Sequence, residues 1–457
     1  MSSSLFFGYP QLALIPNAGI LGLAGYCFAT VVPLWFFAWL GPHIRRVCPD
    51  GFTLSEYIRK RFGRPVGVLS GLIFVGFMFC FMLVELNTYG SVVSLLGGVN
   101  PTVAALIVAL TTTIYTAYGG FKASLWTDNV NAIVIMIFIV MASVAIGVKL
   151  DLQHDRIEAS GLLKPQRLGG ELWYILSAAI IFAQMFNQGF WQRAFASKND
   201  RTLYISVALA TIPLFAICFL VGMCGPLAQW AGLFDGPTAE DDGSTTFFYI
   251  LATLPNWVQG IVLVLAGALT SSAYDTFQSA QISTIQNDVF LGKINIWWCR
   301  LILILLNIPS VVLAVLNIDI LEVFLIADLS AAACLPAFLL GLVKRFYWLN
   351  GFDAFVGALG GFFTVFIFGT IFYGNATDGG KLLGLPNGLY IDDFSVLGAF
   401  FAAPLGSIGW TFAAFGARAG ATWIYCRYTG SEYTVFRYRN FDVKEFALPE
   451  DRPADVL

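Results

Sequence analysis

Residues 115–131 read YTAYGGFKASLWTDNVN and join two apolar segments that are each long enough to cross a bilayer. The stretch contains a diglycine, Gly119–Gly120, and a single acid, Asp128. An ionisable side chain among apolar turns costs on the order of a few kcal/mol, so an acid kept at such a place indicates a functional site. The stretch therefore predicts a break between two membrane spans with a functional acid just beyond it.

Apolar residues dominate the whole chain. Of its 457 residues, 58% are hydrophobic and 12% are charged, whereas a soluble domain carries about 25% charged residues. Apolar segments of about 20 residues recur along nearly the whole length, which is the spacing that a bilayer imposes. The composition predicts an all-α, polytopic membrane protein whose surroundings are the lipid bilayer, with no room for a sizeable soluble domain.

Other functional classes find little support in the sequence. Eight cysteines are scattered along the chain, and with only two histidines no Cys/His metal site can be assembled. Neither a Ser/His/Asp triad nor a phosphate-binding glycine loop is visible, and no basic block suggests nucleic acid. We therefore expect no enzyme, no organic cofactor and no nucleic-acid partner, and the sequence indicates no protein partner.

The apolar pattern predicts about eleven full transmembrane spans. Their approximate ranges are 18–44, 65–95, 101–118, 123–150, 171–195, 203–230, 257–289, 294–316, 321–343, 352–373 and 396–425. Between Pro49 and Gly63, the sequence TLSEYIRKRFG is typical of a short amphipathic helix at the membrane interface.

Basic residues concentrate in alternate loops. These loops contain Arg45, Arg46, Arg59, Lys60, Arg61, Arg64, Lys122, Arg193, Lys198, Arg201, Lys293, Arg300, Lys344 and Arg345. By the positive-inside rule they face the cytoplasm. We therefore expect a multi-pass protein of the plasma membrane with a cytoplasmic C-terminus, and we expect Arg193 and Lys198 to do no more than mark a cytoplasmic helix end.

The segment LAGALTSSAYDTFQSAQ, residues 265–281, has the chemistry of a cation site. Hydroxyls and carbonyls bind sodium without trapping it by excess charge, and broken helices supply free carbonyls. Asp275 lies one turn beyond Ser271 and hence on nearly the same helix face. The alternative is that small residues let helices pack closely while Ser and Thr bond to backbone. The nearby acids favour the cation site.

Three motifs resemble those of the sodium:solute symporter family, and the branch they resemble most includes urea transporters. The motifs are Tyr115–Asp128, Phe186–Asn199 and Ala268–Ser272. The resemblance covers most of the chain and implies a five-plus-five inverted-repeat (LeuT-like) core, followed by two more helices. The units it implies are 1–17 (remnant of the first core helix and outer loop), 18–150 (rest of the first repeat), 151–170 (extracellular loop), 171–345 (second inverted repeat), 346–427 (two additional helices) and 428–457 (polar cytoplasmic tail).

The resemblance also implies where the coupling cation binds. The main sodium site falls on Ala268, Ser271 and Ser272, completed by a backbone carbonyl at Met1. Some members of the family hold a second sodium beside the acid that corresponds to Asp128, and here Asp275 falls in that region. Two nearby acids repel unless a cation lies between them. Sodium and the proton both stay open as the coupling ion.

Two further acids lie within predicted spans and point to the solute. Glu85 lies in FMLVELNTYG and Asp328 in FLIADL, where the resemblance implies that the tenth core helix faces the substrate. Acids there suit a small polar or cationic solute, although either acid could instead be paired with another helix. Together with the resemblance, they predict substrate contacts from Ser4, Leu5, Ala183, Asp328 and Glu85.

The substrate class predicted first is a urea-like solute. Proline, choline and a carboxylate such as pantothenate are alternatives. A sugar is disfavoured because Ile180 and Ala183 stand where sugar-transporting members use an asparagine and a tyrosine. The implied activity is secondary active symport.

The front of the chain departs from the family pattern. Gly8 in SSSLFFGYP resembles the glycine that follows the break in the first core helix, so we expect the half-helix before that break to be absent. A truncated, non-transporting relative or a sensor is therefore an alternative. A passive channel is disfavoured because a channel has no use for a sodium-type hydroxyl site.

Overall fold

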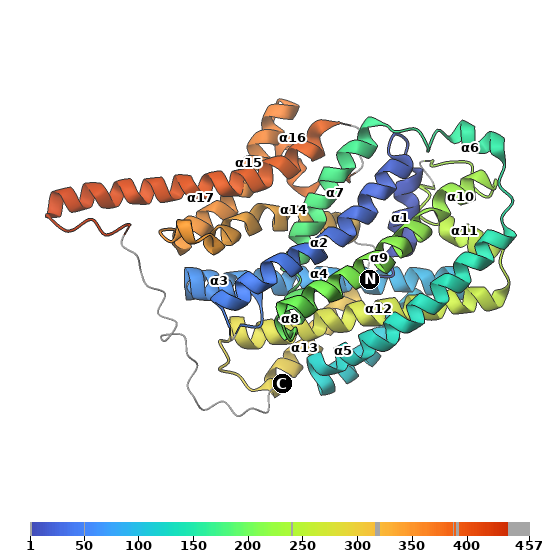
Figure 1. Cartoon of the computed structure of the whole chain (residues 1–457), viewed down its shortest axis with the longest axis horizontal. Helices are drawn as coiled ribbons and strands as arrows, with labels where there is room; N and C mark the ends of the chain where they lie inside the picture. Colours follow the sequence, from blue (N-terminus) through green and yellow to red (C-terminus); the bar gives the residue numbers. More distant parts are fainter. Residues whose placement is uncertain are drawn as a thin grey trace.

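The computed structural model describes residues 2–49, 51–238, 241–315, 320–386, 388–389 and 393–436, and in this part the chain is helical without a strand (Figure 1). Ten of its described helices are long and apolar enough to cross a membrane. The predicted all-α, polytopic architecture is confirmed.

The helices follow one another in three groups along the chain. The first group is α1 (Leu5–Leu14), α2 (Gly19–Val47), α3 (Leu54–Phe62), α4 (Arg64–Gly97), α5 (Pro101–Lys149) and α6 (His154–Ser160). The second is α7 (Arg167–Phe186), α8 (Gln188–Ala196), α9 (Asp200–Gly222), α10 (Cys224–Trp230), α11 (Thr246–Ala252), α12 (Asn256–Thr284), the π-helix η1 (Ile285–Val289), α13 (Ile296–Val315) and α14 (Ile320–Leu339). The third is the short turns η2 (Leu340–Leu342) and η3 (Lys344–Phe346), then α15 (Gly351–Tyr373), α16 (Ala376–Lys381), η4 (Leu382–Gly384) and α17 (Phe394–Thr429).

Helix α5 breaks at the diglycine that the sequence singles out. Gly120 has φ 54° and ψ −146°, a combination that is essentially closed to residues with a Cβ. A Cβ on Gly119 would lie 2.5 Å from that of Ala123. The break divides the 49 residues of α5 into two of the predicted spans, so the ten long helices correspond to eleven spans.

A second break separates α7 from α8 at Asn187, where the sequence predicted one continuous span over 171–195. Asn187 is non-helical, with φ −72° and ψ 100°, and its side chain accepts a hydrogen bond from the backbone of Gly189. The Trp191 indole donates to the carbonyl of Met185 over 2.8 Å. These side chains satisfy backbone groups that the break frees, as a discontinuous helix inside a membrane requires.

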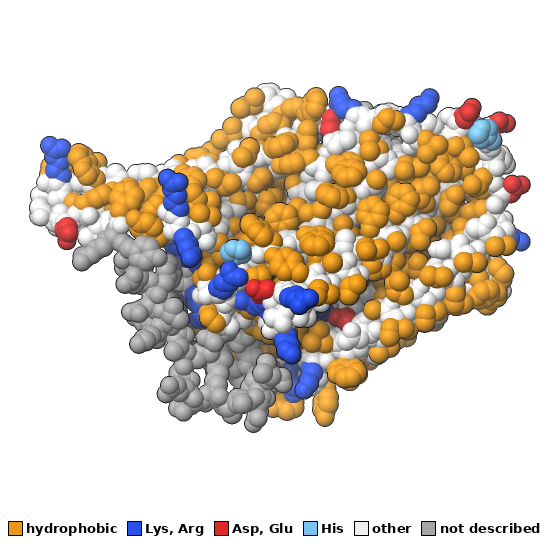
Figure 2. All heavy atoms as spheres, viewed as in Figure 1, with side chains coloured by type: hydrophobic (Ala, Val, Ile, Leu, Met, Phe, Trp, Pro, Cys, Tyr) orange, Lys and Arg blue, Asp and Glu red, His pale blue; other side chains and the backbone are white. Residues whose placement is uncertain are grey.

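Helix α12 packs against α4, both halves of α5, and α8 (Figure 1). Helix α2 packs against α7 and α9, and α15 pairs with α17, which also contacts α7. Figure 2 shows hydrophobic side chains over most of one face, with charged side chains gathered toward its ends. Such a band is expected of a surface that faces lipid.

The short helix predicted between Pro49 and Gly63 is present as α3, and it is tied into the protein body; its place at the membrane interface stays a prediction. Leu54, Tyr57 and Ile58 are fully buried. Arg61 donates to the carbonyls of Gly341, Phe346 and Leu349 just after α14. The apolar face of α3 is therefore held against the bundle by buried packing and by a guanidinium that caps backbone carbonyls.

Candidate cation and solute sites

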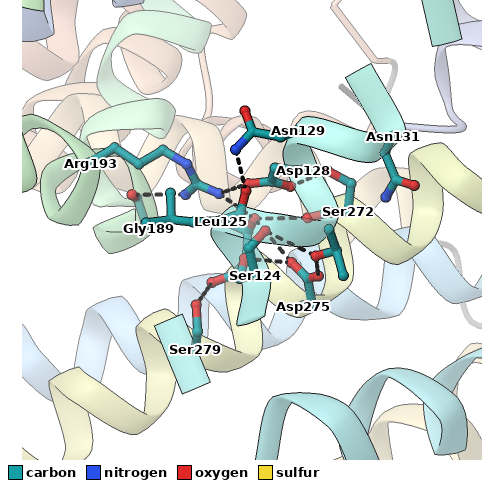
Figure 3. Close-up of polar contacts among 12 residues, drawn as sticks. Ser124, Leu125, Asp128, Asn129, Asn131, Gly189, Arg193, Ser272, Asp275 and Ser279 are labelled. Atoms are coloured by element: carbon teal, nitrogen blue, oxygen red, sulfur yellow. Dashed lines mark hydrogen bonds and ion pairs between the residues drawn. The ribbon is translucent and has the colours of Figure 1, made fainter. Parts of the chain in front are cut away.

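The residues predicted to bind a cation converge where α12 meets both halves of α5 and the start of α8 (Figure 3). Helix α12 brings the segment from Ala268 to Asp275, the second half of α5 brings Asp128, and α8 brings Arg193. The break at Gly120 lets the second half of α5 take a new direction, so that Tyr115 before it and Asp128 after it both reach α12.

Asp275 is fully buried and is held by hydroxyl groups. Tyr115 and Thr127 donate to Oδ2 over 2.7 and 2.8 Å, and Ser124 donates to Oδ1 over 2.7 Å. The three donors come from both sides of the α5 break. Both carboxylate oxygens are therefore satisfied without a cationic side chain, which is how a buried acid is stabilised by hydrogen bonds alone.

Asp128 is held differently, by charge. The Arg193 guanidinium forms an ion pair with Oδ2, and the Ser272 hydroxyl donates to Oδ1 over 2.5 Å. Arg193 also donates to the Thr276 hydroxyl over 2.9 Å and to the Gly189 carbonyl over 3.0 Å. The expectation that Arg193 only marks a helix end is wrong, because its side chain joins α5, α8 and α12.

The two acids belong to one polar network, as the sequence predicted. The Thr276 hydroxyl, which accepts from Arg193, lies 3.4 Å from Oδ1 of Asp275. Sequence reasoning assigned no role in this network to Ser124 or Thr127, and it gave Arg193 only that of a helix end. A signal was present for the first two, since residues 124, 127 and 128 recur at helical spacing on one face.

The three residues predicted for the main sodium site lie together at the same turn of α12. The Ala268 carbonyl accepts from Asn131 over 3.3 Å, and the Ser271 carbonyl accepts from Tyr115 over 3.5 Å. Thr270 donates to the Ser3 hydroxyl over 2.9 Å, which places the start of α1 against this turn. Carbonyl and hydroxyl oxygens from two helices fit sodium. Met1 lies outside the described residues.

A pocket of about 380 Å³ opens beside this turn. It is lined by Tyr115, Trp126, Thr127, Val130, Asn131 and Ser271. Hydroxyl-bearing and amide-bearing side chains of α5 therefore border the space next to Ser271.

Glu85 on α4 and Asp328 on α14 are both buried, with 3% and 1% of their surface exposed. Glu85 lies beside the Ser2 side chain and the Ser3 backbone, next to the start of α1. Oε2 of Glu85 and Oδ1 of Asp328 have no hydrogen-bond partner in the described part of the chain. No lysine, arginine or histidine of that part pairs with either acid, so the alternative of an ion pair with another helix does not apply to the described residues.

The other predicted solute contacts are partly separated. Ser4 precedes α1, and its hydroxyl lies 2.8 Å from that of Ser2. Leu5 is buried in the hydrophobic cluster that includes the first half of α12. Ala183 on α7 is buried in a different hydrophobic cluster. Ala183 and Asp328 make no polar contact with Ser4, Leu5 or Glu85 in the residues that are described.

Comparison with known proteins agrees with this geometry. A model of the sodium:solute symporter family matches residues 1–361. The chain is 41% identical over 438 residues to the spermidine transporter DUR31 of Candida albicans, covering 95% of this chain and 83% of the relative. It is 26% identical over 223 residues to the probable urea active transporter 1 of Schizosaccharomyces pombe, covering 44% of this chain and 33% of that relative.

Among solved structures, the chain resembles a Na+-coupled sialic acid symporter in a substrate-bound, outward-open state. The TM-score is 0.67 at 17% identity, over 89% of this chain and 86% of the other. At this identity the likeness concerns the fold, and it confirms the predicted five-plus-five inverted-repeat architecture.

Proposed function

Because the chain belongs to the sodium:solute symporter family, we propose that it carries a linear organic cation of the polyamine class together with sodium. Sodium-coupled symport of a small solute, and the absence of an enzymatic role, follow from family membership. The identity of the solute, the residues that bind it and the cellular membrane are the proposed part.

The observation that carries the proposal is the pair of buried acids, Glu85 and Asp328. Each has a carboxylate oxygen without a partner in the described residues. A buried charge is costly unless it is paired, and within a membrane span an acid without a partner marks a substrate or ion position. An alkylammonium group supplies both the opposite charge and the hydrogen-bond donors that these oxygens lack.

The similarity to a spermidine transporter supports this solute class, since it extends over nearly the whole chain. Urea, the solute predicted first from the sequence, stays a second candidate. The motif FLIADL, residues 324–329, and the shorter match to a urea transporter favour it. Urea is neutral and would only donate hydrogen bonds to the two acids, so charge distinguishes the two candidates.

In the proposed cycle, sodium binds first at Ala268, Ser271 and Ser272. Because Thr270 contacts Ser3, sodium there stabilises the position of α1 in an outward-open state, and solute binding then allows closure and reorientation. Two repeats, 18–150 and 171–345, would form the moving parts. The loops rich in Lys and Arg would face the cytoplasm of a cell whose plasma membrane holds the protein.

Uptake of labelled spermidine and urea, with and without sodium, tests the proposal. We expect sodium-dependent spermidine uptake that Asp328→Asn reduces by about tenfold or more, since one charge-assisted hydrogen bond is lost. Ser271→Ala should instead raise the sodium concentration needed for half-maximal uptake. Uptake of urea alone, little affected by Asp328→Asn, would contradict the polyamine proposal and favour the second candidate.

A further inference from the structure

Beyond the cation site, helix α12 and its π-turn carry a row of buried polar side chains. The row consists of Asp275, Gln278, Gln281, Thr284 and Asp288, all fully buried. Successive members are three or four residues apart, which is about one turn. The row leads from the network at Asp275 to the end of the helix where the basic loops lie.

The row contains hydrogen-bond acceptors that the protein does not satisfy. Gln278 donates to Thr113 and Asn307 over 2.8 Å each, and Gln281 donates to the Val75 carbonyl over 3.2 Å. Their own carbonyl oxygens, together with Oγ1 of Thr284 and Oδ1 of Asp288, have no partner in the described residues. Buried acceptors are rarely left unpaired, so a run of them indicates water or a cation along the row.

Asp288 stands at the end of this row in the π-turn η1, Ile285–Val289. Turns of this kind occur frequently at functional sites because they expose backbone and redirect side chains. Oδ2 of Asp288 accepts a hydrogen bond from Thr53 over 2.7 Å, and Thr53 is the N-cap of α3. Oδ1 stays free to bind a ligand.

Two serine hydroxyls adjoin the same place. Ser55 and Ser70 both donate to the Gly67 carbonyl, over 3.1 and 2.8 Å. Their protons are therefore engaged, and their lone pairs remain available to a cation. At Gly71 a Cβ would lie 3.3 Å from both the Ser55 hydroxyl and the Asp288 Cβ, so the serine and the acid both pack closely against this glycine of α4.

We propose that Asp288, Thr53, Ser55 and Ser70 form a second sodium site at the end of α12, from which sodium leaves the protein after passing along the buried row. A hard cation prefers oxygen ligands, and one carboxylate with three hydroxyls supplies them. The charged groups acting on Asp288 are Glu56 and Arg59 of α3. Asp128, by contrast, is already paired with the Arg193 guanidinium. The inference rests on sodium coupling and is independent of the solute.

Binding of radioactive sodium to the purified full chain, without solute, tests the site. Asp288→Asn retains an oxygen that accepts from Thr53 but removes the charge, whereas Thr53→Val removes the tether and keeps the carboxylate. We expect Ser271→Ala to retain a weaker class of bound sodium, and we expect Asp288→Asn in that background to weaken it about tenfold or more. Thr53→Val removes one of the three hydroxyl ligands but keeps the charge, so it should weaken this class less than Asp288→Asn does.

Thermal melting of each variant separates a binding role from a structural one. If Asp288→Asn fails to fold, Ser55→Ala with Ser70→Ala removes two ligands without touching the acid. Equal sodium binding by Ser271→Ala with and without Asp288→Asn would overturn the site. The site would also be overturned if Asp288→Asn changed the number of protons that the protein takes up on titration but left sodium binding unchanged. Failure of spermidine uptake would overturn the proposed solute and leave this measurement unaffected.

Discussion

Asp128 and Asp275 lie in one network, yet their charges are stabilised in two ways. Hydroxyls surround Asp275, while the guanidinium of Arg193 neutralises Asp128. The resemblance implied that Asp275 lies in the region of Asp128, but it did not give the donors to Asp275, which all come from α5. The sequence could not predict the second arrangement, because a basic residue at a helix end is common and its partner lies 65 residues away in the chain.

Removing Arg193 should lower the free energy of unfolding, because Asp128 would remain partly buried without a counter-charge. Arg193→Gln leaves Asp128 without its counter-charge, and we expect a loss of about 1–3 kcal/mol, below the value for a fully buried pair. About a quarter of each side chain is exposed, 28% and 23%. Thermal melting measures the loss, and Asp128→Asn in the same background should restore most of it. Equal melting temperatures for wild type and Arg193→Gln would argue against a stabilising pair.

Cys48, just after α2, should make stability depend on alkaline pH. Burial, followed by the nearby Glu56 carboxylate, raises the pKa of its thiol from 9.0 to about 11. The unfolded chain therefore loses this proton first, so the contribution is complete below about pH 9 and is lost as pH rises toward 11. The total is about 2–3 kcal/mol. Melting temperatures between pH 8 and pH 11 should fall less steeply for Cys48→Ser; parallel curves would show that the thiol contributes nothing.

At the scale of helices, a break is predictable from sequence when the backbone needs a special residue. The α5 break requires backbone angles at Gly120 that only glycine adopts readily, so the diglycine Gly119–Gly120 predicts the break. The break before α8 needs only ordinary angles at Asn187 and is stabilised by Trp191, whose partner is the Met185 carbonyl. The sequence of residues 171–195 therefore carries no signal that distinguishes such a break from a continuous span.

Gly120→Ala tests whether the α5 break positions the cation site. A side chain at φ 54° and ψ −146° is strained, which should cost about 1–3 kcal/mol and shift the second half of α5. Sodium affinity should fall, because Ser124, Thr127 and Asp128 follow the break. Gly147→Ala is the matched control on the same helix, where an added Cβ meets nothing within 4 Å. Equal sodium affinity for all three proteins would show that the site tolerates a straighter α5.

At the scale of the whole molecule, the proposed sodium and solute sites meet at the start of α1. Ser3 contacts Thr270, the residue before Ser271, while the same short segment lies beside Glu85. The resemblance already implied that this segment serves both sites, through Met1 and through Ser4 and Leu5. It did not imply the contact between Ser3 and Thr270, which depends on how distant segments pack. A movement of α1 would therefore change the surroundings of Thr270 and of Glu85 together.

This junction predicts reciprocal coupling between the two ligands. Sodium should tighten spermidine binding by a factor of about 5–150, and by linkage spermidine should tighten sodium binding by the same factor. Calorimetry on the purified chain, titrating each ligand with and without the other, measures both factors. Asp328→Asn should weaken spermidine binding by about tenfold or more while sodium still binds. Ser271→Ala should remove the enhancement by sodium. Sodium affinity that is unchanged by saturating spermidine would show that the two sites are independent, and the contact between Ser3 and Thr270 would then serve packing alone.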